Sequence, residues 1–153
     1  MLSKPKNGWT NFELSKKNTY SLSYLNDVSI DWLDAAIDGL KNLKPFVVRG
    51  FLEPSRMICT VSYWNTHIFV EDDEDEELKI EDSCYEIIHI NMLDFCKELY
   101  ENINDNLQDW IDWFCDEEID LNKRKDDLIT KLEELKQLIE KQKEYFNGNY
   151  FFS

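Results

Sequence analysis

The chain has little of what breaks regular structure and none of the long apolar runs that enter membranes. Its 153 residues include only four Gly and three Pro, too few for a disordered chain or a long flexible linker. No stretch reaches the ~18 consecutive apolar residues of a membrane span, and no signal-peptide-length apolar stretch follows the basic amino terminus. The sequence therefore predicts one folded domain, residues 1–153, located in the cytoplasm and without membrane contact.

Motifs for catalysis and for metal binding are missing as well. There is no P-loop, GxGxxG, GxSxG or HExxH, and the two histidines, His67 and His89, each lie inside an apolar run. The cysteines contain no CxxC pair and are Cys59, Cys84, Cys96 and Cys115. Since zinc sites use short ligand spacings, we expect no metal, no cofactor and no enzyme, with the thiols free and buried. A Cys/His nucleophilic pair that meets only in space stays open.

The first ninety residues favour strands with one short helix. Trp9–Leu14 and Tyr20–Leu25 read as a hairpin, because short alternating or aromatic runs flank a polar turn. Ser29 is expected to cap a helix that ends near Lys44, before Pro45. Apolar and β-branched residues then predict four further strands, at Phe46–Leu52, Met57–Tyr63, His67–Glu71 and Tyr85–Ile90.

From Asn91 onwards the apolar period changes from two to 3.6, which predicts two long helices packed as a hairpin over residues 91–153. The first, Asn91–Cys115, has an apolar face of Met92, Cys96, Leu99, Ile103, Leu107, Trp110 and Phe114. The second, Glu118–Phe146, is expected to bury Leu121, Leu128, Leu132, Leu135 and Ile139. The predicted fold class is α+β, an antiparallel sheet of five to six strands with one short helix, followed by these two helices.

What the chain has in excess is acid, and the acid is localised. The net charge is −15, yet residues 71–82 and residues 101–120 each carry −8, so the rest of the chain carries +1. General solubility does not require such clustering. A protein of this charge repels phosphate, so direct binding to nucleic acid is not expected. Basic protein surfaces are the partners that this charge favours.

Within the first long helix, carboxylates recur at spacings of three and four residues. They fall within about 40° of Asp105 on a helical wheel, opposite the apolar face. The residues of this stripe are Asp94, Glu98, Glu101, Asp105, Asp109, Asp112 and Asp116. Like charges at these spacings cost stability, and residues 101–120 contain no Lys or Arg to offset them. One interpretation is a solvated face partly neutralised by the second helix; the other is a docking face for a basic partner.

Two further features bear on the docking interpretation. Trp113 lies at the edge of the stripe, where a large aromatic is typical of interface anchors, although it could instead pack under the following helix. The acidic run at residues 71–77, with Asp72, Asp73 and Asp75, is expected to form a solvated loop that adds to the partner surface. It lacks the Gly of an EF-hand loop and lies between strands, which argues against calcium binding.

In size, localised acidity and α+β character, the chain resembles bacterial toxin-immunity proteins of contact-dependent inhibition and related polymorphic toxin systems. The stretch Tyr20–Leu40 (YSLSYLNDVSIDWLDAAIDGL) carries part of this resemblance. The resemblance implies a cytosolic inhibitor that neutralises a basic, nuclease-type toxin by covering its active site. Two alternatives are a nucleic-acid mimic that blocks a DNA-binding protein, and an assembly protein or homodimer that pairs through the last helix.

Overall fold

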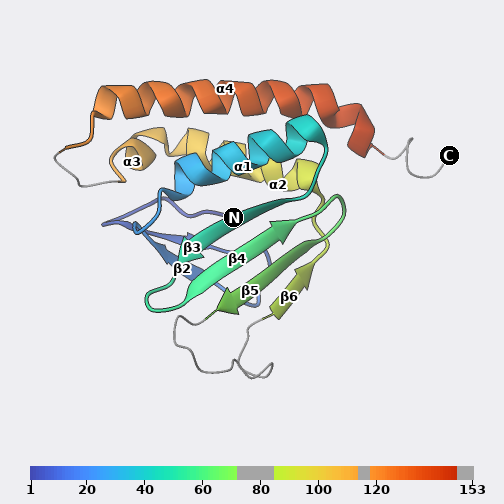
Figure 1. The fold of residues 1–153 in the computed structure, drawn as a ribbon, viewed down its shortest axis with the longest axis horizontal. Helices are drawn as coiled ribbons and strands as arrows, with labels where there is room; N and C mark the ends of the chain where they lie inside the picture. Colours follow the sequence, from blue (N-terminus) through green and yellow to red (C-terminus); the bar gives the residue numbers. More distant parts are fainter. Residues whose placement is uncertain (72–84, 114–117, 148–153) are drawn as a thin grey trace.

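The computed structural model describes residues 1–71, 85–113 and 118–147. The chain has an α+β fold with two antiparallel sheets, one of two strands and one of four. The helices lie along one side of the four-stranded sheet, and the amino-terminal hairpin lies behind that sheet (Figure 1). The order of elements along the chain confirms the predicted α+β class, while the single sheet of five to six strands is wrong.

The two-stranded sheet is the predicted hairpin. β1 (Trp9–Phe12) pairs with β2 (Tyr20–Ser23) in the register Trp9↔Ser23 to Phe12↔Tyr20. Phe12 and Leu22 are buried, and the ring of Phe12 meets that of Trp32 edge to face, with centroids 4.9 Å apart. This contact fixes the hairpin against the first helix without any backbone pairing to the larger sheet.

The four-stranded sheet is a meander in the order β3-β4-β5-β6. Its strands are β3 (Phe46–Phe51), β4 (Arg56–Val61), β5 (Thr66–Glu71) and β6 (Tyr85–Ile88), which confirms the four strands predicted after the first helix. β2 lies beside β3 but does not extend this sheet. The carbonyl of Arg49 on the β3 edge already accepts from Trp32 Nε1 at 2.7 Å and from Asn26 Nδ2 at 3.2 Å. Side chains therefore occupy an edge group that a fifth strand would need.

α1 spans Val28–Asn42, close to the predicted helix, but its cap differs. Asp27 is the N-cap, and its carboxylate accepts from the backbone N–H of Ile30 at 3.3 Å. The predicted cap, Ser29, is instead a fully buried residue inside the helix. Asp and Ser are both strong N-cap residues, so the local pattern could not decide between them. The helix ends at Leu43, in the left-handed conformation.

The predicted first long helix is divided into two. α2 spans Met92–Asp105, with Asn91 as its N-cap, and the short α3 spans Leu107–Ile111. Asn106 separates them, and its side-chain amide donates to the carbonyl of Asn102 at 3.0 Å. Asn is a poor helix former because its side chain competes for backbone groups. The uninterrupted helix over Asn91–Cys115 is therefore wrong, although the apolar face of α2 is buried as predicted.

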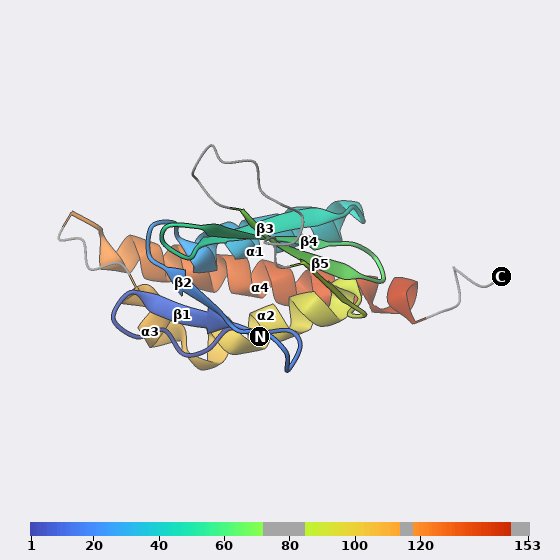
Figure 2. The same ribbon diagram turned by 90° about the horizontal axis from the view of Figure 1, so that it is seen from below.

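α4 spans Leu121–Phe146 and is the one long carboxyl-terminal helix of the described residues. It starts three residues later than predicted, because Asp120 caps it by accepting from the backbone N–H groups of Asn122 and Lys123. Leu128, Leu132 and Leu135 are buried, but Leu121 is 46% exposed. α4 packs against α1 and α2 and runs along the side away from the sheet (Figures 1 and 2).

One hydrophobic cluster joins both sheets to α1, α2 and α4. Its aromatic centre contains Phe12, Trp32, Phe46 and Phe95, linked in a chain of ring contacts. Each strand of the larger sheet alternates, so one face enters this cluster and the other faces away from the helices. None of the helices in the described part of the chain is long and apolar enough to span a membrane.

Candidate functional site

A row of four exposed carboxylates lies on α2. Asp94, Glu98, Glu101 and Asp105 are all exposed, while Met92, Cys96, Leu99 and Ile103 of the same helix are buried. We call these four carboxylates the α2 acidic face. They hold a fixed spacing because the buried side of the helix anchors them. Figure 2 shows α2 along one edge of the molecule.

Within the described part of the chain, the α2 acidic face has no ion pair with a cation, although Lys97 lies on the same helix. No Lys, Arg or His of the described ranges lies within ion-pair distance of its four carboxylates. The cations of α4 go elsewhere: Arg124 pairs with Asp27 and Lys131 with Asp34, both acids at the start of α1. In this structure, α4 therefore forms no ion pairs with the four carboxylates of α2 within the described ranges, in contrast to the first interpretation of the stripe.

Asp109 and Asp112 continue the acidic sequence pattern beyond α2, but in a different environment. Asp109, on α3, is half-buried and lies 3.8 Å from the ammonium of Lys4. Asp112 follows α3, is exposed, and accepts from Gln108 Nε2 at 3.1 Å. A pocket of about 300 Å³ separates these acids from the turn at residues 5–8. Asp109 therefore has a nearby cation that the four carboxylates of α2 lack in the described ranges, and Asp112 is held by a neutral amide.

Trp113 is not an exposed anchor. It is 2% exposed and its ring stacks at a tilt on Trp110, with centroids 5.1 Å apart. The alternative interpretation, packing inside the structure, is the one observed. The indole N–H groups of Trp110 and Trp113 are both buried, with no hydrogen-bond acceptor among the residues that the structure describes. Trp113 contributes to packing at the end of α3, where it also lines the pocket beside Asp109 and Asp112.

Four predicted partner-binding residues lie outside the described residues. They are Asp72, Asp73, Asp75 and Asp116. Cys84 and Cys115 lie outside them as well, whereas Cys59 and Cys96 are buried free thiols. Burial raises the pKa of both described thiols well above the usual range, so neither is a nucleophile at neutral pH. Among the residues with described positions, no group of three or more His, Cys, Asp or Glu side chains is arranged to hold a metal ion.

The sequence interpretation missed Arg124, which organises one end of the helical layer. Its guanidinium is 7% exposed and binds both carboxylate oxygens of Asp27. It also donates to Ser29 Oγ at 3.1 Å and to the carbonyls of Trp110 and Ile111 at 2.8 and 3.1 Å. One side chain thus joins the start of α1, the end of α3 and the start of α4. A detectable signal existed: Arg124 precedes Leu128 by four residues, and therefore shares the buried face of α4.

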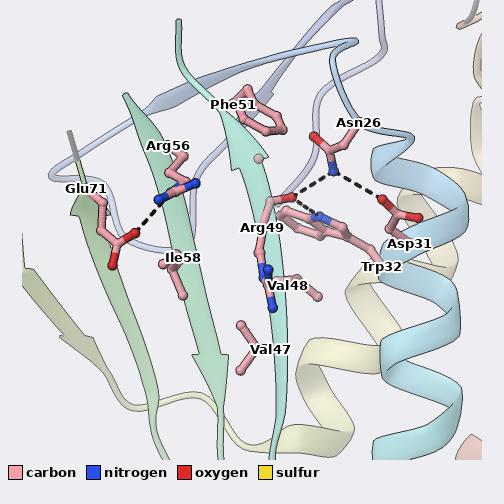
Figure 3. A pocket seen from close by; sticks show the side chains of 11 residues that line it. Asn26, Asp31, Trp32, Val47, Val48, Arg49, Phe51, Arg56, Ile58 and Glu71 are labelled. Carbon is pink, nitrogen blue, oxygen red and sulfur yellow. Dashed lines mark hydrogen bonds and ion pairs between the residues drawn. The ribbon is translucent and has the colours of Figure 1, made fainter. Parts of the chain in front are cut away.

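A second feature is a pocket of about 670 Å³ beside β3 (Figure 3). Asn26, Asp31 and Trp32 line it from the start of α1, and residues of β3, β4 and β5 line it from the sheet. Burial, the largest cause, raises the pKa of Asp31, and the nearby Asp27 and Asp34 add to the rise. Arg56 pairs with Glu71 at 3.0 Å across the sheet. The described residues that line the pocket include the charged side chains of Asp31, Arg49, Arg56 and Glu71.

Comparison with protein-family models, with curated protein sequences and with solved structures gives no match to this chain. The assignment of a function therefore depends on the arrangement of the residues themselves.

Proposed function

We propose that this chain is a small acidic binding protein that docks a basic protein surface through the α2 acidic face. The observation that carries the proposal is the absence of ion-pair partners for Asp94, Glu98, Glu101 and Asp105 in the described ranges, although all four are exposed. Carboxylates on a helix anchored by its buried face keep their positions before a partner arrives. Such a preorganised field accelerates association and selects partners of opposite charge.

The partner that this chemistry fits best is a nuclease-type toxin, which must present a basic cleft to hold nucleic acid. A row of carboxylates laid over that cleft would occupy the path of the phosphate backbone. On this proposal the chain is an inhibitor of the toxin-immunity class, and it acts without catalysis. The resemblance in size and charge pattern supports the same class.

Protection of growing bacterial cells tests the proposal. The chain is co-expressed with a nuclease toxin domain encoded beside it, and survival is compared for two variants. One reverses Glu98, Glu101 and Asp105 of α2 to Lys, and the other reverses three exposed acids of α4, Asp126, Glu134 and Glu144, to Lys. Both variants change the net charge by the same amount, so only the position of the charge differs.

The proposal predicts that the wild type and the α4 variant protect and that the α2 variant does not, with all three folded by circular dichroism. Equal protection by the α2 and α4 variants would exclude the α2 acidic face as the docking surface. If the wild type instead displaces DNA from several unrelated DNA-binding proteins and protects against no toxin, the nucleic-acid mimic replaces this proposal.

A further inference from the structure

The outer face of the four-stranded sheet, the face turned away from α1, α2 and α4, carries exposed apolar residues among polar ones such as Thr60 and His67. Its exposed residues include Val47 on β3, Phe69 on β5 and Ile87 on β6, at 41%, 37% and 51% exposure. In an antiparallel sheet with one face in water, the outward positions are usually polar. In this sheet apolar residues occupy outward positions on all four strands, since Ile58 of β4 lies directly between Arg49 and Phe69 in register.

The outward face of the small hairpin is mixed in the same way. Asn11 lies opposite Ser21 and both are exposed, while Trp9 on the same face is 38% exposed. No described helix or strand covers the outer face of the larger sheet (Figures 1 and 2). The apolar residues of that face are therefore a candidate interface, because an exposed apolar patch of this kind marks an association surface.

The charged residues on this face indicate which binding partner fits it. Arg49 has no carboxylate within ion-pair distance in the described part of the chain, and Arg56 pairs with Glu71. The face thus carries both signs around an apolar centre. A two-fold interface brings one patch onto an identical patch, so it must be self-complementary. The α2 acidic face cannot meet itself, because it carries one sign only, whereas the outer sheet face can.

We propose that this face binds a second copy of the chain, forming a symmetric dimer with the two sheets packed face to face. In the strand order β3-β4-β5-β6, a two-fold axis along the strands, between β4 and β5, places β3 of one copy opposite β6 of the other. The pocket beside β3, lined by Val47, Phe51 and Ile58, then faces the protruding Ile87 of the second copy.

The same two-fold axis determines which charged residues face each other across the interface. Arg56 of β4 and Glu71 of β5 are directly paired in register, at the same level along the strands. The axis exchanges β4 and β5, so Arg56 of each copy faces Glu71 of the other. The intramolecular pair thereby becomes part of a four-residue network at the interface. This dimer is independent of the proposed function, since it uses a different face of the molecule and needs no basic partner.

Sedimentation velocity of the purified chain, from micromolar to near-millimolar concentration, tests the dimer. The wild type is expected to show a concentration-dependent dimer that strengthens as salt screens the repulsion between two chains of charge −15. Ile87→Lys should weaken dimerisation at least tenfold. The matched control is Ile129→Lys, the same change at a residue of 43% exposure on α4, which should leave dimerisation unchanged.

A charge exchange tests the axis itself. Arg56→Glu and Glu71→Arg should each be monomeric alone, because each homodimer would bring like charges together. Mixed in equal amounts, they should form a heterodimer, since every facing pair then has opposite signs.

A wild type that stays monomeric throughout the range would overturn the inference. So would a dimer that is lost in Ile129→Lys and kept in Ile87→Lys, which would identify α4 as the interface. If both single exchanges dimerise as well as the wild type, the proposed axis is wrong.

Discussion

Three of the four acids of α1 and its N-cap have cationic partners in the described ranges, unlike the four carboxylates of the α2 acidic face, although both helices belong to one layer. The fourth, Asp31, has a hydrogen bond from Asn26 instead. Asp27, Asp34 and Asp38 each have a cationic partner, respectively Arg124, Lys131 and Lys44. The four carboxylates of the α2 acidic face have none in the described ranges. The comparison separates acids that hold the fold together from acids that remain available to another molecule. Total charge alone would not have distinguished them.

The largest loss of stability should come from removing Arg124, the buried cation of the described residues. Arg124→Met leaves Asp27 without its cationic partner and removes a donor from the carbonyls of Trp110 and Ile111. Breaking a buried pair from one side costs about 3–5 kcal/mol of unfolding free energy. Urea denaturation measures it. Lys44→Met, which breaks an exposed pair, is the control and should cost less than about 1 kcal/mol. Equal losses in the two variants would contradict the structural role assigned to Arg124.

A second test concerns Glu86 of β6, which links the larger sheet to the hairpin region. Burial raises its pKa, but hydrogen bonds from Ser15 (2.6 Å), Tyr20 and Asn18 outweigh that effect, and the net shift is downward from 4.5. A lowered pKa stabilises the folded state above pH 4.5, and this stability is lost as the pH falls through the folded-state value.

Glu86→Gln should therefore cost about 1 kcal/mol at neutral pH, with a difference from the wild type that disappears in acid. Urea midpoints between pH 3 and pH 7 give the measurement. A difference that stays constant over this range would show that the charge of Glu86 does not contribute.

A third, smaller effect is expected where an α1 acid meets a cation near the surface. Asp34 is 54% exposed and Lys131 is 28% exposed. Screening by water limits such a pair, so Asp34→Asn should reduce the unfolding free energy by less than about 1 kcal/mol. Thermal denaturation at low and high salt measures it. A loss that does not diminish with salt would show that the hydrogen bond, not the charge, stabilises the pair.

The smallest effect should have the opposite sign. Neutralising the α2 acidic face with Glu98→Gln, Glu101→Gln and Asp105→Asn removes like-charge repulsion at three- and four-residue spacings and an acid from the end of the helix. Each pair contributes a few tenths of a kcal/mol, so the variant should gain about 0.5 kcal/mol. Asp94 is kept because an acid in the first turn is favourable. A clear loss of stability would mean that these carboxylates have structural partners after all.

The sequence predicted where the strands and helices lie along the chain better than it predicted which elements pair or pack together. The β-branched and aromatic content of Phe46–Leu52 and His67–Glu71 was enough to locate β3 and β5, since composition is a local property. The separation of the hairpin from the larger sheet depends on Trp32 and Asn26 reaching the carbonyl of Arg49, a contact between distant residues. No local pattern reports such a contact.

The acidic site could also be predicted only in part, because local patterns do not report contacts between distant residues. Helical spacing located Glu98, Glu101 and Asp105 on one exposed face. The break at Asn106, the burial of Trp113 and the burial of Arg124 altered the end of the stripe. These depend on how α3 and α4 meet, which single-helix periodicity does not contain.

The most direct test of the account is the rate at which the chain associates with its basic partner. Stopped-flow association with the toxin domain identified by protection is measured over a range of ionic strengths. The variant with Glu98, Glu101 and Asp105 reversed should associate about 10- to 100-fold more slowly at low salt and lose most of the salt dependence. The α4 variant of equal charge should retain both. Indistinguishable rates and salt dependences for the two variants would contradict the assignment of the α2 acidic face as the docking surface.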